Sequence, residues 1–248
     1  MDQRAFKKKN LHTKSISYQD DNCDLEAFVA YPSEKKGPLV ILCHAWKGRD
    51  AFICEKAQEI AQWGYVGFAL DMYGKGVSGK SKEESAALKR PFIEDRSLLQ
   101  KRVIKGFEVA SNLPYVDAKR VAVLGLGFGG ICALDLARSG ANLKGAISIY
   151  GHFDPPPKFL IKPIKAKVLI LHGYNDPIIP QEELRRFEKE MNEGRVDWQA
   201  HIYGNTMHAF ATPGANDPEA GLLYNPVAAA RAWIAVREFL HEVFVEGW

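Results

Sequence analysis

The sequence has few cysteines, no long apolar run and little net charge, and each shortage argues against a class of protein. Its four cysteines lie singly, without C-x-x-C spacing, unlike the dense cysteines of secreted disulfide-bonded domains. The net charge is only +3, so we expect no nucleic-acid partner. No apolar run approaches the length of a membrane span, and the polar residues after Met1 do not resemble a signal peptide. We therefore expect a cytoplasmic protein with no membrane partner.

The remaining composition is that of an ordinary globular enzyme. Apolar residues make up 46% of the chain and charged residues 25%, which argues against a disordered or fibrous protein. A chain of 248 residues is long enough for one large core, and α/β folds of this size commonly form one domain. We expect a single domain over residues 1–248, present as a monomer or a small homo-oligomer.

Short apolar runs alternate with stretches of helical periodicity, after a hairpin whose turn contains Asp20, Asp21 and Asn22. This alternation predicts an α/β fold, with a mostly parallel, twisted sheet and helices on both faces. The predicted strands are Thr13–Tyr18, Leu25–Tyr31, Leu39–Cys43, Tyr65–Leu70, Arg120–Leu124, Gly145–Tyr150, Val168–His172 and Trp198–Tyr203. The predicted helices are Ala51–Trp63, Leu98–Leu113, Gly130–Ser139, Glu182–Asn192 and a last helix from Pro226. The stretch Tyr73–Pro91 predicts a loop and a short helix, either a surface connection or a substrate lid.

A glycine-rich segment follows the predicted strand that ends at Leu124, and two motifs compete for it. The pattern Gly125-x-Gly127-x-x-Gly130 fits a dinucleotide fingerprint, in which glycines let a pyrophosphate approach a helix. It also fits a nucleophile elbow, with glycine at the nucleophile position, residue 127. The fingerprint normally follows the first strand of its domain and needs an acidic residue at the end of the next strand. Several strands precede this segment, and the first downstream carboxylate, Asp154, comes too late. The elbow is therefore favoured.

A nucleophile elbow predicts an acid and then a histidine downstream, each in a loop after a strand. Asp176 follows the predicted strand Val168–His172, and His208 follows Trp198–Tyr203. Alone, each has a simpler explanation. Aspartate is common in turns, and a single histidine near an aromatic residue is often an ordinary, partly buried side chain without a catalytic role. Together, in the required order, they favour the acid and base of a catalytic triad.

Five segments together resemble the dienelactone hydrolases. They are Gly125–Gly140, Leu171–Pro177, Val196–Gln199, Gly204–Phe210 and Ala215–Pro218. The similarity runs from about Lys14 to the C-terminus, in order and with few gaps. The resemblance implies an α/β-hydrolase fold and a carboxymethylenebutenolidase-like hydrolase of small esters or lactones, which needs neither a metal nor an organic cofactor.

The resemblance also implies the site residues. It makes Asp176 the triad acid and His208 the general base, and it places an oxyanion hole at the backbone amides of Phe128 and Trp46. Such donors depend on backbone position rather than on the side chain. We also expect a substrate pocket over residue 127. The residues expected to contact substrate there are Ala45, Tyr73 and Phe210.

Three positions depart from the family pattern. Gly127 stands where the family has its nucleophilic cysteine, and glycine offers neither thiol nor hydroxyl. Ala45 replaces a glutamate that influences this cysteine, and Ala211 and Thr212 stand where the best-known members have an arginine for the dienelactone carboxylate. The first departure removes the family's first catalytic group. The other two weaken the case for the namesake substrate.

The missing nucleophile leaves several hypotheses open. Cys132 lies within the helix after the elbow and Cys43 within a buried strand, so both are expected in the core. The serines of the loop, at positions 78, 81 and 85, have no spacing that singles one out. A water activated by His208 could attack directly, at a lower rate. The alternative is a non-catalytic protein that uses the same pocket to bind a small acidic or ester ligand.

Overall fold

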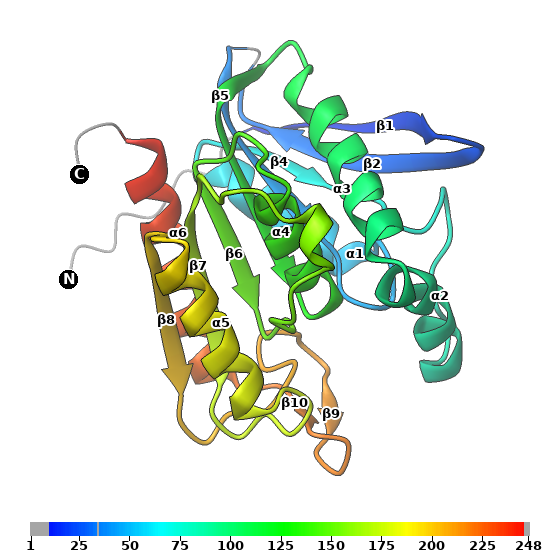
Figure 1. The fold of residues 1–248 in the computed structure, drawn as a ribbon. Coiled ribbons are helices and arrows are strands. Elements are labelled where there is room, and N and C mark those ends of the chain that lie inside the picture. The colour runs from blue at the N-terminus through cyan, green and yellow to red at the C-terminus, as the bar shows by residue number, and fades with distance from the viewer. Residues whose placement is uncertain (1–9, 34, 246–248) are drawn as a thin grey trace, which may run out of the picture.

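The computed structural model describes residues 10–33 and 35–245, which form a large sheet surrounded by helices (Figure 1). The large sheet consists of β1 (His12–Asp20), β2 (Cys23–Tyr31), β3 (Gly37–Cys43), β4 (Val66–Ala69), β5 (Val116–Leu126), β6 (Gly145–Ile149), β7 (Lys167–Gly173) and β8 (Trp198–Tyr203). The helices are α1 (Ala51–Gln62), α2 (Lys82–Glu94), α3 (Arg96–Ser111), α4 (Phe128–Arg138), α5 (Gln181–Glu193) and α6 (Pro226–Phe244). A 3-10 turn (Lys158–Leu160) and the small strands β9 (Asn216–Asp217) and β10 (Leu222–Leu223) complete these ranges. No helix described there has the length and apolarity to cross a membrane.

The sheet is mostly parallel, as predicted. Its strand order is β1-β2-β4-β3-β5-β6-β7-β8, with β1 antiparallel to β2 and β2 antiparallel to β4. The other neighbouring strands are parallel. From β3 the chain passes to β4 on one side and later to β5 on the other, so the strand order reverses between β3 and β5. In open α/β sheets, ligands bind at such a reversal, outside the carboxyl ends of the strands.

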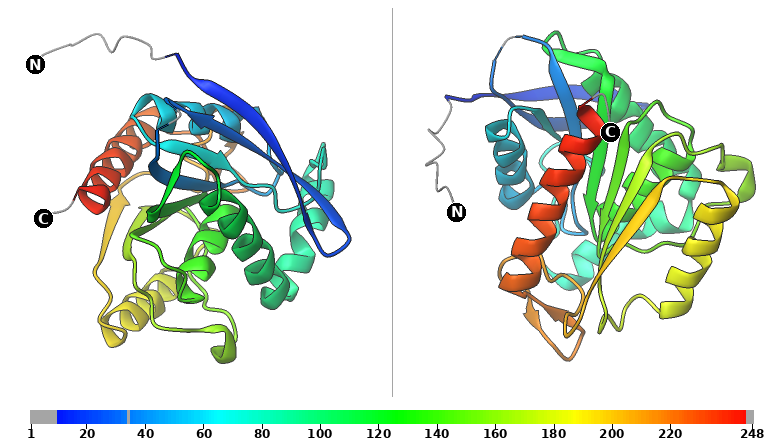
Figure 2. Two further views of the ribbon diagram at one scale, coloured as in Figure 1. Left: turned by 90° about the horizontal axis from the view of Figure 1, so that it is seen from above. Right: turned by 90° about the vertical axis from the view of Figure 1, so that its left-hand side faces the viewer.

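Helices cover both faces of the sheet, which explains why the central strands are apolar throughout. One face packs against α1 and α6, and the other packs against α3, α4 and α5 (Figure 2). Every residue of β4 and β6 is buried, as expected for strands enclosed on both faces. Every residue of α4 is buried too, so this helix lies in the interior and holds its N-terminus firmly at the sheet edge.

The predicted loop and helix of the stretch Tyr73–Pro91 are present, but the helix is longer than expected. Helix α2 has 13 residues and continues past Pro91 to Glu94. It begins where the Ser81 hydroxyl accepts a hydrogen bond from the Glu84 amide at 3.1 Å, which satisfies one free N–H of the first turn. The last turn forms despite the proline, because the Asp95 amide donates to the Pro91 carbonyl at 2.9 Å. Proline removes one intrahelical hydrogen bond and its ring crowds the preceding turn, yet the helix continues to Glu94.

Candidate active site

A single residue, Gly127, separates the buried strand β5 from helix α4. Its backbone angles are φ 54° and ψ −111°, and positive φ of this kind strains residues other than glycine. The turn also packs tightly against the neighbouring strand, since a Cβ on Gly129 would lie 2.0 Å from the Cys43 carbonyl oxygen. The strand–turn–helix expected for a nucleophile elbow is therefore present, and glycines are needed for its close packing.

The space above Gly127 would accept a side chain. A Cβ placed there would lie 3.5 Å from Cε2 of Tyr150 and 3.8 Å from Nε2 of His208. Both distances are ordinary van der Waals contacts, so a Cβ fits there, and its cost lies in the backbone conformation. The missing side chain would therefore lie directly beside the histidine ring.

Asp176 and His208 form the hydrogen-bonded pair that the motif order predicts. Nδ1 of His208 donates to Oδ2 of Asp176 at 2.7 Å. The aspartate side chain is fully buried, whereas the histidine keeps 12% of its side-chain surface exposed. The pair comes from the loops that follow β7 and β8, two neighbouring parallel strands. With Nδ1 bonded to the acid, Nε2 is the nitrogen that faces the elbow.

Asp176 is held by further contacts. Its Oδ1 accepts hydrogen bonds from the amides of Ile178 at 2.8 Å and Ile179 at 3.2 Å. Behind it, Nδ1 of His172 lies 4.0 Å from Oδ2. Burial lowers the pKa of His172 below its usual range, so this imidazole is neutral near pH 7. The carboxylate therefore has His208 as its close charged partner when that ring accepts a proton.

Two backbone amides are free to act as an oxyanion hole. The Phe128 amide belongs to the first residue of α4, where helix geometry supplies no acceptor. In residues 10–33 and 35–245, no acceptor is bonded to the Trp46 amide. His44 fixes the chain just before it, because its Nδ1 donates to the Ala45 carbonyl at 2.7 Å and its Nε2 accepts from the Met72 amide at 3.2 Å. A nitrogen that accepts a hydrogen bond carries no proton, so this ring is neutral, and burial lowers the pKa of His44 accordingly.

A cavity of about 1130 Å³ opens over Gly127. Of the residues expected at the site, Ala45, Trp46, Phe128 and His208 line it. Six basic and four acidic residues also line it, which are Lys47, Lys80, Lys82, Lys89, Arg90, Arg96, Asp50, Glu94, Asp154 and Asp217. The cavity is large enough for a small organic molecule, and its excess of cationic groups suits a neutral or anionic one.

Tyr73 and Phe210 do not line this cavity, contrary to expectation. The hydroxyl of Tyr73 donates to the Trp46 carbonyl at 3.0 Å, and its ring packs 5.6 Å from that of Phe128. It therefore lies behind Trp46 and Phe128. Phe210 is fully buried, with its ring 5.4 Å from that of Tyr150. Each side chain points into the core instead of into the cavity, and there it packs behind a residue of the cavity wall.

Tyr150 is a site residue that the sequence analysis missed. It lines the cavity, and its ring is edge-on to His208 at 5.1 Å between centroids. Its hydroxyl shares a 2.7 Å hydrogen bond with Thr212, across the loop that carries the histidine. Its backbone has φ 41°, a conformation that strains a non-glycine residue. Its place at the end of β6, beside the elbow strand, was the one available signal.

None of the considered protein nucleophiles is placed to replace residue 127. Cys43 and Cys132 are fully buried, and burial raises the pKa of both thiols, which keeps them protonated and unreactive. Ser81 lines the cavity, but its oxygen caps α2. Within the described ranges, no group of three or more His, Cys, Asp or Glu side chains could hold a metal ion.

Comparison with known proteins agrees with this geometry. Residues 25–244 match the dienelactone hydrolase family. A protein of Saccharolobus solfataricus named "Putative carboxymethylenebutenolidase" is 25% identical over 93% of this chain and 98% of its own. A protein of Bradyrhizobium named "Probable 2-oxo-3-(5-oxofuran-2-ylidene)propanoate lactonase" is 27% identical over 79% of this chain and 80% of its own.

Solved structures lead to the same family. The structure named m3DLH has a TM-score of 0.90 and 31% identity, covering 95% of this chain and 99% of its own. A dienelactone hydrolase-like promiscuous phosphotriesterase from metagenomic libraries has a TM-score of 0.89 and 28% identity, with the same coverage. This chain thus has the α/β-hydrolase fold, with the sheet order, the elbow, Asp176 and His208 described above. This chain belongs to the dienelactone hydrolase family.

Proposed function

We propose that the protein hydrolyses small carboxylic esters or lactones, with a water molecule in place of the side-chain nucleophile. One observation carries the proposal: His208 is bonded to Asp176 at 2.7 Å, and its Nε2 faces the space over Gly127. Family membership supports a hydrolase function. The names of the two relatives, a carboxymethylenebutenolidase and a lactonase, support ester or lactone chemistry.

In this mechanism a water bound beside His208 attacks the carbonyl carbon directly. Nε2 takes a proton from the water as the new carbon–oxygen bond forms, and Asp176 stabilises the charged ring. The amides of Phe128 and Trp46 donate to the oxygen that becomes negatively charged. The bond to the leaving oxygen then breaks, and no covalent enzyme intermediate forms. Without covalent catalysis, turnover is expected to be slow.

Turnover of p-nitrophenyl acetate tests this proposal. The wild-type protein should release p-nitrophenol at a steady rate without an initial burst, because no acyl-enzyme accumulates. His208→Ala should lower the rate above background by about 100-fold or more. His241→Ala is a matched control, since this histidine is exposed on α6. Equal rates in wild type and His208→Ala would contradict the proposal.

Gly127 itself favours a second function, ligand binding without turnover. A glycine leaves more room at the bottom of the cavity and removes the family's reactive group. On this hypothesis, calorimetric titration with small carboxylates or stable ester analogues should show saturable binding, and the esters should remain intact. Cleavage that depends on His208 would exclude this function.

A further inference from the structure

A second histidine–carboxylate pair lies at the wall of the same cavity. His152 comes shortly after β6 and lines the cavity. Its Nδ1 lies 3.2 Å from Oε2 of Glu183, a residue of α5 that is only 4% exposed. Most of α5 is solvent-facing, and Glu183 is the one charged residue among its three buried positions. A buried carboxylate must be paired or hydrogen-bonded, and the His152 ring is one of the groups that bind this one.

The second histidine lies close to the elbow. Gly151, the residue before it, is packed so tightly that a Cβ there would lie 2.7 Å from Cα of Gly130 and 3.1 Å from the carbonyl oxygen of Gly127. The backbone leading to His152 therefore contacts the turn where the reaction is proposed to occur. Because Nδ1 faces Glu183, Nε2 is the ring nitrogen left for a ligand in the cavity.

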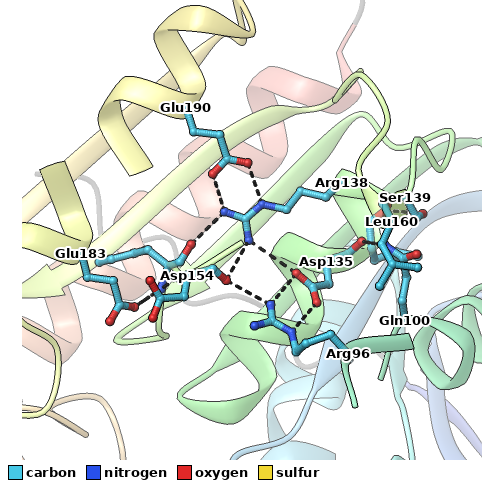
Figure 3. Close-up of polar contacts among 11 residues, drawn as sticks. Arg96, Gln100, Asp135, Arg138, Ser139, Asp154, Leu160, Glu183 and Glu190 are labelled. Atoms are coloured by element: carbon cyan, nitrogen blue, oxygen red, sulfur yellow. Dashed lines mark hydrogen bonds and ion pairs between the residues drawn. The ribbon is translucent and has the colours of Figure 1, made fainter. Parts of the chain in front are cut away.

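Buried charges hold the segment that carries this histidine on both sides (Figure 3). Oε1 of Glu183 accepts hydrogen bonds from the amides of Phe153 and Asp154. Arg138 donates to the Phe153 carbonyl at 2.8 Å, and Arg96 donates to the Asp154 carbonyl at 3.1 Å. Amides and carbonyls of the same loop are thus bound by ionised side chains. Such a loop is fixed far more tightly than a connection that only joins two elements.

The same arginines belong to a larger network behind α4 (Figure 3). Arg96 binds both carboxylate oxygens of Asp135, at 2.7 and 2.8 Å. Arg138, which is fully buried, binds both oxygens of Glu190, at 2.6 and 2.9 Å. Buried ionic networks rarely stabilise a fold more than apolar side chains of similar volume would. A positional role for the loop explains this network better than stability does.

Hydrogen bonds also keep the second carboxylate ionised. Burial raises the pKa of Glu183, but hydrogen bonds from His152 and from the amides of Phe153 and Asp154 outweigh it and lower that pKa overall. Through this contact the carboxylate at Nδ1 fixes the orientation of the His152 ring.

We propose that His152, oriented by Glu183, is a second catalytic histidine that donates a proton to the leaving oxygen of the substrate. The proposal rests on the hydrolase function proposed above. The oxygen of water bonds to the acyl carbon while its proton passes to His208. As the bond between the acyl carbon and the leaving oxygen breaks, that oxygen takes the proton from Nε2 of His152. The products are a carboxylic acid and an alcohol, and the two histidines return to their starting states by exchanging protons with solvent.

Esters with leaving groups of different basicity test this role. Phenoxide, whose conjugate acid has a pKa of about 10, needs a proton to leave, whereas 2,4-dinitrophenoxide leaves readily without one. His152→Gln should therefore lower turnover of phenyl acetate by about 100-fold and that of 2,4-dinitrophenyl acetate much less. Glu183→Gln should show the same pattern as His152→Gln, with a larger loss for phenyl acetate than for 2,4-dinitrophenyl acetate. His241→Gln carries the same substitution on an exposed helix face and should change neither rate.

Each outcome decides between the proposals. Equal losses for both esters in His152→Gln, or no loss for either, would overturn the role of His152 while leaving His208-dependent hydrolysis intact. Absence of His208-dependent turnover in wild type would instead overturn the proposed function. The ester series would then be repeated in the Gly127→Cys chain, where expulsion of phenoxide still requires a proton and expulsion of 2,4-dinitrophenoxide does not. Equal losses or inactivity there would overturn the role of His152 as well.

Discussion

Replacing Gly127 with cysteine is the most direct perturbation of the site. The new Cβ would contact Tyr150 and His208 at 3.5 Å or more, so it fits without a clash. The backbone, however, has φ 54°, and holding a non-glycine residue in such a conformation costs about 1–3 kcal/mol. In a chain of this size each kcal/mol shifts the melting temperature by about 2–4 °C. We expect the variant to melt about 2–12 °C below wild type.

The same variant should gain esterase activity. The thiol would lie beside His208, and a neighbouring imidazole favours the reactive thiolate. The oxyanion would meet the amides of Phe128 and Trp46. Stopped-flow measurement with p-nitrophenyl acetate should show a burst close to one equivalent, followed by a steady rate above that of wild type. Iodoacetamide should abolish the burst, since it blocks the thiol.

Gly127→Ala separates the two effects. It introduces the same backbone strain without a nucleophile, so its melting temperature should fall as far as that of Gly127→Cys while no burst appears. If the alanine variant were as stable as wild type, the strain assigned to the elbow would be wrong. If the cysteine variant were folded but inactive towards every activated ester, the argument that the catalytic geometry is intact would be refuted. The binding function would then be favoured.

Three further variants test what supports the site. Asp176→Asn should lower esterase turnover by about 100-fold or more, since an amide cannot stabilise the charged ring of His208, while circular dichroism stays unchanged. Arg138→Met should lower the free energy of unfolding by about 1–3 kcal/mol in urea titrations, because Glu190 loses its arginine and Asp135 keeps only Arg96; the exposed Arg237→Met should be near neutral. Glu183 has a lowered pKa in the folded state, so its stabilisation is present above its unfolded pKa of about 4.3 and is lost as the pH falls through the lower folded value. Glu183→Gln should therefore make the free energy of unfolding less dependent on pH below about pH 5.

The sequence predicted the central sheet well because its strands are enclosed on both faces. Such strands are short continuous apolar runs, and each predicted one matches an observed strand to within a few residues. Helix α2 was underestimated because Pro91 and the glycines before it resemble a loop. The hydrogen bonds that stabilise its ends, such as that from the Glu84 amide to the Ser81 hydroxyl, are weak signals of a helix in the sequence. The two-residue strands β9 and β10 are too short for any periodicity to reveal.

The positions of the elbow, Asp176 and His208 were predictable because each follows the carboxyl end of a strand, and parallel strands bring those ends together. The rest of the wall depends on side-chain direction. Tyr73 and Phe210 also follow strand ends, yet each turns into the core. Tyr150 and His152 reach the cavity from the loop after β6, where a single aromatic residue and a single histidine form no motif. Contacts between distant elements, such as His152 with Glu183 on α5, leave no pattern in the linear sequence.

The buried ionic network gives a physical reason to regard the cavity as a maintained site. Burial raises the pKa of Asp135 despite the opposing charges of Arg96 and Arg138. An acid whose folded pKa exceeds its unfolded value contributes less stability once it ionises, so the contribution of Asp135 falls as the pH rises through its titration range. The network therefore does not owe its presence to Asp135 as a source of stability. Its arginines also bind the carbonyls of Phe153 and Asp154, beside the cavity histidine. The network therefore fixes the loop that carries His152 at the cavity wall. Chemistry or binding at that wall would be a reason to keep such a network even if it adds little stability.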